Sequence, residues 1–225
     1  MLLDVESELK EYGVKEFGEE WWKVNDLDDW LIVLKNNASY KSYFDGLANG
    51  LIARKFASIL SIEEEAVLKF YTTNAGYKDF NRALRGEIPM TDFYTAQKNL
   101  MEQAMSKMQN SIYNGASHLL YRIENLTESQ IANIYKEGDI INTTSFTSAT
   151  YSESAIIDAI RTRSYTVLIR IEGKSGKLIE ELSTLPLEKE ILFRPGTNFK
   201  VDKVGFSPNP DDYMTPIKTI WLKEL

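Results

Sequence analysis

Two glutamates separated by one residue, Glu188 and Glu190, form the first pattern with chemical potential. In an extended segment, residues i and i+2 point to the same face, with Cα atoms roughly 6.5 Å apart. Two carboxylates at this spacing share one pocket without sharing one proton, so they can take different roles. A loop-like Leu185-Pro186-Leu187 precedes them and an apolar strand pattern follows. Taken alone, such a pair is more often a solvated acidic strand edge.

Two further patterns carry polar groups. Arg122 ends the apolar strand pattern His118-Leu119-Leu120. A guanidinium there suits bidentate binding of a diphosphate or a carboxylate, although a hydrated surface arginine is the commoner finding. Hydroxyl residues gather at 143–150 and include Ser148. They can bridge a cleft by hydrogen bonds, or they reflect β propensity and edge polarity.

The elements that must position these residues change in type along the chain. Apolar residues at helical spacing run through residues 2–24, and the same spacing predicts helices at 39–60, 61–73, 78–86 and 91–113. β-Branched and aromatic runs predict strands after residue 117, with one helix at 152–163 between them. We therefore expect an α+β fold, in which N-terminal helices are followed by a largely antiparallel β-sheet system. A helical N-terminal extension at 1–60 would precede the main domain at 61–225.

Composition excludes several kinds of site and partner. The 225 residues contain no cysteine and one histidine, which removes disulfides, thiolate chemistry and multi-histidine metal sites. His118 is expected to be a structural residue within its strand. The net charge of −7 provides no positive electrostatic field that would attract the phosphates of a nucleic acid. No apolar run is long enough to span a membrane. We expect no metal, no nucleic acid and no membrane span.

Taken together, the three patterns occur in the order Arg, aromatic-x-Ser and Glu-x-Glu, with about 25 and 40 residues between them. This arrangement resembles the arginine–serine–glutamate class of mono-ADP-ribosyltransferases, the class of the binary actin-modifying bacterial toxins. Other segments agree with it over about residues 60–205. They are the helical lead-in from Ser61 to Gly86, the strand Val167–Ile171 with the loop Gly173–Gly176, and the closing hairpin Glu190–Val201.

The resemblance implies N-terminal helices followed by a mostly antiparallel two-sheet β core. It also implies NAD as co-substrate and a role for each matched residue. Arg122 would grip the NAD diphosphate, and Ser148 would orient Glu190. Glu190 would hold the 2′-hydroxyl of the nicotinamide ribose, and Glu188 would engage the incoming nucleophile. The resemblance also implies further cofactor-binding positions, which are Asn81, Arg85 and Arg170.

The sequence departs from the family pattern at three positions. The family's Ser-Thr-Ser is Ser148-Ala149-Thr150 here, so only the first position is kept. The aromatic residue expected before the first glutamate is Leu185, which removes a stacking group from the substrate loop. A second arginine that sometimes follows the first is Ile123.

The chemistry of ADP-ribosyl transfer fits two carboxylates with separate tasks. Nicotinamide leaves NAD without a proton, and the ribose passes through an oxocarbenium-like centre that a carboxylate stabilises. An arginine acceptor has a pKa above ~12, so a second carboxylate must orient it and take its proton. In the family, Glu rather than Gln at the first position implies an arginine acceptor, and that position is Glu188.

We therefore expect an NAD-dependent mono-ADP-ribosyltransferase that modifies arginine on a protein such as actin or another host protein. It would be a monomeric catalytic unit, secreted as a bacterial toxin or effector acting in the host cytosol, or cytoplasmic if it is internal to a phage or cell. The alternatives are an NAD glycohydrolase and a catalytically silent copy of the fold that serves as an adaptor or phage structural module. A two-carboxylate glycosidase leaves Arg122 without a role.

Overall fold

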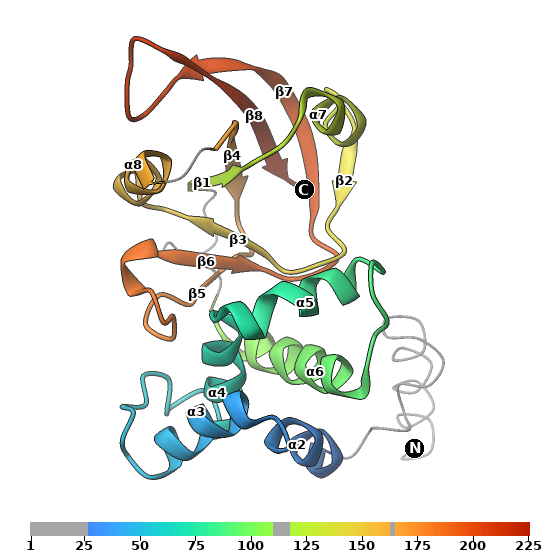
Figure 1. Cartoon of the computed structure of the whole chain (residues 1–225), viewed down its shortest axis with the longest axis vertical. Coiled ribbons are helices and arrows are strands. Elements are labelled where there is room, and N and C mark those ends of the chain that lie inside the picture. The colour runs from blue at the N-terminus through green and yellow to red at the C-terminus, as the bar shows by residue number, and fades with distance from the viewer. Residues whose placement is uncertain (1–26, 110–117, 163–164) are drawn as a thin grey trace.

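The computed structural model describes residues 27–109, 118–162 and 165–225. Helices come first and strands dominate later, which confirms the α+β prediction (Figure 1). The helices are α2 (Leu27–Lys35), α3 (Ala38–Ala48), α4 (Ile62–Tyr71), α5 (Asn74–Leu84), α6 (Asp92–Lys107), α7 (Glu128–Ile134), α8 (Glu153–Thr162) and the 3-10 turn η2 (Pro186–Glu188). The strands are β1 (His118–Glu124), β2 (Ile140–Asn142), β3 (Thr147–Thr150), β4 (Val167–Gly173), β5 (Lys177–Leu178), β6 (Glu190–Phe193), β7 (Asn198–Pro208) and β8 (Pro216–Glu224).

The helix boundaries follow local signals in most places. Ser61 accepts a hydrogen bond from the backbone of Glu64, whose side chain in turn accepts one from the Ser61 backbone, so α4 begins with a capping box. The helix predicted over 39–60 is too long, because α3 ends at Ala48 and Gly50 adopts a positive φ of 69°. A left-handed glycine ends a helix readily. The helical pattern at residues 2–24 lies outside the described residues.

The strands form one hydrogen-bonded array in the order β2-β7-β8-β4-β1-β3-β6-β5. Only the β4–β8 pair is parallel among the strands described. Two sheets were expected, whereas the described strands form one eight-stranded sheet that divides into two parts. A single register pair, Tyr121 opposite Thr150, joins the larger part to β3, β6 and β5. Figure 1 shows these three strands running in a different direction from β4, β7 and β8.

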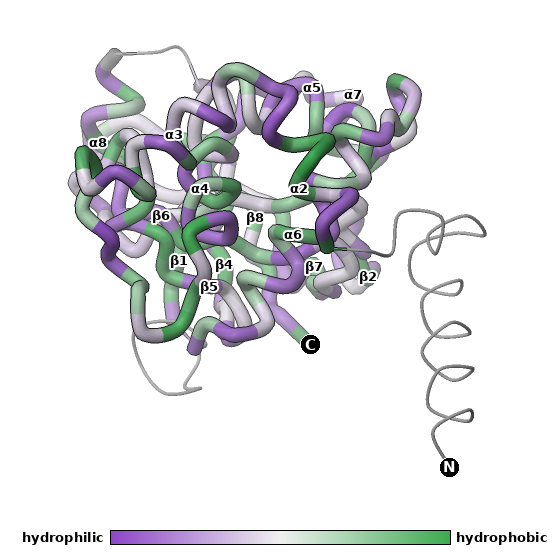
Figure 2. Tube along the Cα trace, turned by 90° about the horizontal axis from the view of Figure 1, so that it is seen from below, coloured by the Kyte–Doolittle hydropathy of each residue, from purple (hydrophilic) through white to green (hydrophobic). Residues whose placement is uncertain are grey.

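Three buried clusters hold the elements together. The first lies among helices α2 to α6 and reaches β6 through Leu192. The second fills the bend between the two parts of the sheet, with Ile191 and Phe193 packed among residues of β1, β4, β7 and β8. The third lies between α8 and the sheet. Figure 2 shows hydrophobic and hydrophilic residues alternating along the helices, as expected for helices with one face on a core.

The described part of the segment assigned to an N-terminal extension, residues 27–60, packs with the rest of the chain. Leu34 on α2 and Tyr40 on α3 are fully buried in the same cluster as Leu68 on α4 and Met101 on α6. The proposed boundary at 60/61 coincides with the start of α4, and the division into two domains stays a prediction. No helix in the described ranges is long and apolar enough to cross a membrane.

Candidate active site

Arg122 lies on β1 with its guanidinium held at two points. Its Nε donates to Glu124 Oε1 at 2.5 Å, and its Nη1 donates to the backbone carbonyl of Ser148 at 2.7 Å. Strand alternation places Arg122 and Glu124 on one face of β1, which allows the ion pair. Burial opposes the charged guanidinium, but the Glu124 carboxylate outweighs it, so the pKa of Arg122 lies above its usual value. The guanidinium therefore stays charged and fixed in direction.

Ser148 joins Arg122 to Glu190. In the β3–β6 pairing, Thr150 is opposite Glu190 and Ser148 is opposite Leu192, so Ser148 and Glu190 are diagonal neighbours on one face. The Ser148 side chain hydrogen-bonds the Glu190 carboxylate, while its carbonyl accepts from Arg122. The three predicted residues thus meet at one place, although they lie on three different strands.

Glu190 is held in a poorly solvated environment, with 7% of its surface exposed. Burial is the largest influence and raises its pKa, the Ser148 hydrogen bond lowers it, and the charge of Glu188 raises it again. Arg122 adds a smaller lowering effect, and the resulting pKa of Glu190 is about 6. At neutral pH Glu190 is therefore mainly a carboxylate, at a higher energy than one in water.

The local geometry predicted for the acidic pair is wrong. Glu188 ends the 3-10 turn η2, and Lys189 adopts a left-handed conformation with φ 52°, so the segment is not extended. Pro186 favours this turn because its fixed φ suits the first helical position. Glu188 is exposed, yet its charge still acts on Glu190. The two carboxylates thus differ in solvation while remaining electrostatically coupled.

Asn81 is connected to this group through a tyrosine. Asn81 Nδ2 on α5 donates to the hydroxyl of Tyr71 on α4 at 3.1 Å. Burial raises the pKa of the Tyr71 phenol, and the charges of Glu190 and Arg122 also act on it. The Tyr71 ring packs on Phe146, with 5.5 Å between ring centroids. The helical layer therefore forms one wall beside the Arg122–Ser148–Glu190 group.

Arg85 lies at the margin of the same region. Its Nε pairs with Glu87 Oε1 at 2.6 Å, and its Nη1 is 3.5 Å from Ser145 Oγ, which precedes β3. The side chain is 42% exposed. A ligand that used this guanidinium would have to compete with Glu87 for it.

Arg170 is not brought to this group. In the β1–β4 pairing, Arg122 is opposite Ile169, whereas Arg170 is opposite Tyr121. Because side chains alternate along strands, Arg170 and Arg122 project from opposite faces of the sheet. The Arg170 guanidinium instead lies over the Tyr121 ring, 5.8 Å from its centroid. The position expected to bind phosphate is therefore turned away from the other candidate residues.

Sequence reasoning missed two residues of this region. Glu124 was not singled out, although its spacing of two residues from Arg122 on a predicted strand places both on one face. Tyr71 entered only as part of the helical lead-in, since nothing in its sequence neighbourhood links it to Glu190. His118 begins β1 and is half-buried, in keeping with a structural role.

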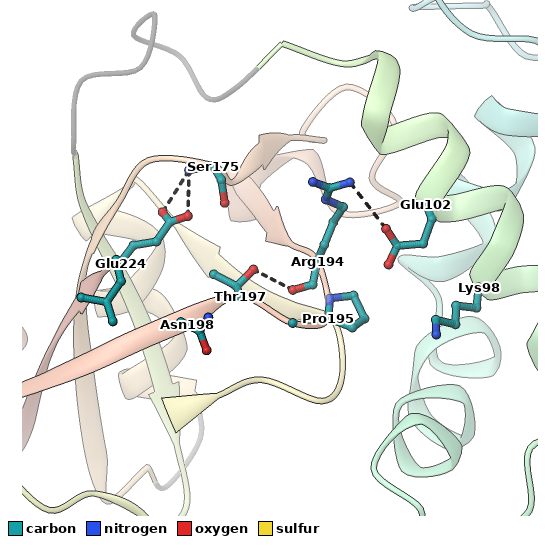
Figure 3. A pocket seen from close by; sticks show the side chains of 10 residues that line it. Lys98, Glu102, Ser175, Arg194, Pro195, Thr197, Asn198 and Glu224 are labelled. Atoms are coloured by element: carbon teal, nitrogen blue, oxygen red, sulfur yellow. Dashed lines mark hydrogen bonds and ion pairs between the residues drawn. The ribbon is translucent and has the colours of Figure 1, made fainter. Parts of the chain in front are cut away.

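The pocket drawn in Figure 3 is separate from this group. Its walls are α6 and the turn between β6 and β7, at the opposite end of β6 from Glu190. Arg194 Nη1 lies 3.7 Å from Glu102 Oε2 across it, and Glu224 accepts from the backbone of Ser175. It contains none of the residues predicted for the active site.

Comparison with known proteins identifies relatives of one kind. The sequence model of the ADP-ribosyltransferase exoenzyme family matches residues 34–218. The chain is 28% identical over 149 residues to the NAD(+)–protein-arginine ADP-ribosyltransferase Tre1 of Serratia proteamaculans, covering 65% of this chain and 30% of the relative. It is 30% identical over 162 residues to the putative NAD(+)–arginine ADP-ribosyltransferase Mav of Mycobacterium avium, covering 72% of this chain and 18% of the relative.

The fold is also shared with solved structures. Exoenzyme S from Pseudomonas aeruginosa, solved in complex with human 14-3-3 protein beta and bound to carba-NAD, superposes with a TM-score of 0.63. The two chains are 18% identical, and 88% of each is covered. The chain spans less than a third of the length of the curated relatives that it matches.

Proposed function

The chain belongs to the ADP-ribosyltransferase exoenzyme family, and from this premise we propose that it transfers ADP-ribose from NAD to an arginine side chain of a protein. The observation that carries the proposal is the meeting of Arg122 and Glu190 at Ser148. A diphosphate needs a fixed cation, and an oxocarbenium centre needs a fixed carboxylate. The names of the curated relatives support arginine as the acceptor.

Arg122 would bind the NAD diphosphate. Its Nε is already held by Glu124 and its Nη1 by the Ser148 carbonyl, so the guanidinium direction is fixed before NAD arrives. Preorganisation of this kind lowers the entropic cost of binding. Asn81 and Arg85 would line the cofactor site from the helical side, where Tyr71 and Ser145 hold them.

Glu190 would act at the ribose. Its carboxylate accepts a hydrogen bond from the 2′-hydroxyl as the bond between ribose C1′ and the nicotinamide nitrogen breaks. The bonding electron pair leaves with nicotinamide, which departs neutral, and positive charge develops at C1′. The incompletely solvated carboxylate of Glu190 stabilises that charge more strongly than a carboxylate in water would.

Glu188 would serve the acceptor. It is exposed and adjacent to Glu190, where an incoming guanidinium can reach it from solvent. As an arginine nitrogen bonds to C1′, one proton leaves that nitrogen and passes to the Glu188 carboxylate. The products are nicotinamide, ADP-ribosyl-arginine and a proton, which Glu188 returns to water.

The sources of the relatives support a proposal about the biological setting. We propose a secreted bacterial effector or toxin that modifies actin or another host protein. The two curated relatives come from bacteria, and exoenzyme S of Pseudomonas aeruginosa was solved with a human protein. The chain offers a catalytic unit for such a protein.

The test uses labelled NAD with agmatine, a small guanidine acceptor, so that no protein target is needed. Wild type should release nicotinamide and form ADP-ribosyl-agmatine. Glu188→Gln should lose transfer but keep NAD hydrolysis, whereas Glu190→Gln should lose both by about 100-fold or more. Glu181→Gln, an exposed glutamate of the preceding loop, is the matched control.

Each alternative function has its own result in this experiment. Free ADP-ribose without ADP-ribosyl-agmatine, and without any labelled protein in a host lysate, would identify an NAD glycohydrolase. Absence of NAD binding by calorimetry would identify a silent adaptor. Equal loss of transfer and hydrolysis in Glu188→Gln would contradict the separate roles of the two carboxylates.

A further inference from the structure

Lys189 lies between the two glutamates in an unusual conformation. Its φ of 52° is the single positive φ among the non-glycine residues that the structure describes. A side chain with a Cβ disfavours this region, so something nearby must hold it there. The conformation matters because it turns the chain between Glu188, which ends η2, and Glu190, which begins β6.

An ion pair holds the Lys189 side chain. Its Nζ contacts Oε1 of Glu180, a residue between β5 and η2. The two side chains are 35% and 19% exposed, so the pair is partly shielded from water. Glu180 Oε2 accepts a second hydrogen bond, at 2.6 Å, from the hydroxyl of Tyr151. Both contacts lower the pKa of Glu180, and the contact with Lys189 has the larger effect, so Glu180 stays charged.

The same contacts tie the loop to the strands of the active site. Tyr151 directly follows β3, the strand that supplies Ser148. On the other side, the backbone N–H of Ile179 donates to the Glu190 carbonyl at 3.1 Å. Glu180 therefore stands next to a residue already fastened to Glu190. The ion pair closes the loop 180–189 at its base, and Glu188 lies inside that loop.

We propose that Lys189 and Glu180 form a latch that holds Glu188 at a set position relative to Glu190, and that the latch decides how the ribosyl group is divided between an arginine acceptor and water. The inference rests on the proposed function. Lys189, Glu180 and Tyr151 are positioning residues, because the geometry gives them contacts to the loop and to one another rather than to the reacting atoms.

The physical reason lies in the different demands of the two outcomes. NAD cleavage needs Arg122 and Glu190, which the strands position. Transfer also needs an acceptor nitrogen close to C1′ in competition with water, and an error of about 1 Å in such a placement costs up to about 100-fold. Loss of the latch should therefore reduce transfer and leave hydrolysis nearly intact.

The test measures the ratio of ADP-ribosyl-agmatine to free ADP-ribose, together with kcat and KM for NAD. Lys189→Met and Glu180→Gln should lower the ratio about tenfold, with hydrolysis within about threefold of wild type. Lys189→Arg keeps the charge and should keep the ratio. The reversal Lys189→Glu with Glu180→Lys should recover part of it.

Two further variants separate positioning from stability. Lys189→Gly relieves the cost of the positive φ but removes the ion pair, so we expect a low ratio despite an unchanged or higher Tm. Lys223→Met removes another lysine–glutamate pair, 3.2 Å from Glu172 between neighbouring strands, and should leave the ratio unchanged. A wild-type ratio in Lys189→Met, or recovery by Lys189→Gly, would overturn the latch.

A second measurement needs no activity. Amide hydrogen exchange of residues 183–189 should be faster in Lys189→Met than in wild type, while exchange of β6 stays the same. An inactive wild-type enzyme would overturn the proposed function, and the exchange would then decide on the latch by itself. Equal exchange in both proteins would show that no latch exists.

Discussion

Ser148 contributes to the site through both of its polar ends. Its carbonyl takes a hydrogen bond from Arg122, and its hydroxyl binds Glu190. The cation and the carboxylate to which we assign the diphosphate and the ribose are thereby both in contact with Ser148. Replacing Ser148 by alanine would remove only the second contact, because the first belongs to the backbone.

The ionisation of Glu190 sets a pH dependence for NAD cleavage. In the proposed mechanism the carboxylate of Glu190 is the active form, and the pKa of this group is about 6. We therefore expect kcat/KM for NAD to be at its plateau above pH 7, to halve near pH 6 and to fall about tenfold for each further pH unit. Initial rates of nicotinamide release from pH 4.5 to 8 measure this. A profile flat down to pH 5 would contradict it.

The same group should make the folded protein less stable at high pH. Its pKa is about 6 when folded against an ordinary 4.5, so stability is lost as pH rises from 4.5 through 6. The full effect is about 2 kcal/mol. Glu190→Gln, which stays neutral, should raise the free energy of unfolding by about that amount at pH 8 and by little at pH 4. Urea unfolding at both pH values tests this, and equal differences would count against it.

Two arginines offer a direct comparison of the sheet's two faces. Arg122→Gln should raise KM for NAD at least about tenfold, because the cation fixed by Glu124 is lost. Arg170→Gln should change KM by less than about twofold, since Arg170 projects from the other face. Steady-state kinetics on both variants decide the matter. A large KM effect from Arg170→Gln would show that NAD extends around the sheet.

At the level of elements, α4 organises the segment that precedes it. Glu65 is fully buried and accepts hydrogen bonds from Arg54 Nε at 3.2 Å, Arg54 Nη2 at 3.0 Å and the backbone of Phe56 at 3.2 Å. The non-helical stretch after α3 is thus fastened to the helix that carries Tyr71. The Glu65 carboxylate thus accepts hydrogen bonds from backbone N–H groups that have no helical partner in that stretch.

Removing this carboxylate should destabilise the protein strongly. Glu65→Ala leaves Arg54 and two backbone donors without their acceptor, so we expect a loss of about 3 kcal/mol in the free energy of unfolding. The control is Glu63→Ala on the same helix, whose partner Lys35 is 4.0 Å away and partly exposed. That pair should contribute less than about 1 kcal/mol. Chemical denaturation measures both, and similar losses would refute the assignment.

Across the whole molecule, residues of the helical layer and of the sheet belong to one buried cluster. Leu34, near the start of the described chain, lies in the cluster that reaches Leu192 on β6. We expect Leu34→Ala to lower the free energy of unfolding by about 2–5 kcal/mol. The protein should still unfold in a single cooperative transition, at a lower midpoint temperature. Calorimetry tests this. A separate early transition, with the catalytic part unaffected, would instead favour an independent unit at 1–60.

Local sequence patterns predicted the type of most elements but not every path of the chain. Capping at Ser61 and the apolar strand after Glu190 were readable because both depend on neighbouring residues. The end of α3 at Ala48 had a local signal in Gly50, but the path of the stretch after it was not readable, because Glu65 holds that stretch from a different helix. The turn at Glu188 and Lys189 was missed for the same reason, since Glu180 and Tyr151 hold it from elsewhere.

Residue types and their order along the chain were sufficient to indicate the family and the chemistry, because an arginine, a serine and two glutamates have the same chemical abilities in any setting. Which of these groups can act together was decided by the tertiary structure. Strand register turned Arg122 toward Ser148 and Arg170 away from it. Burial raised the pKa of Glu190, whereas Glu188 stayed exposed to solvent. Both depend on contacts between segments far apart in sequence, and no local pattern contains them.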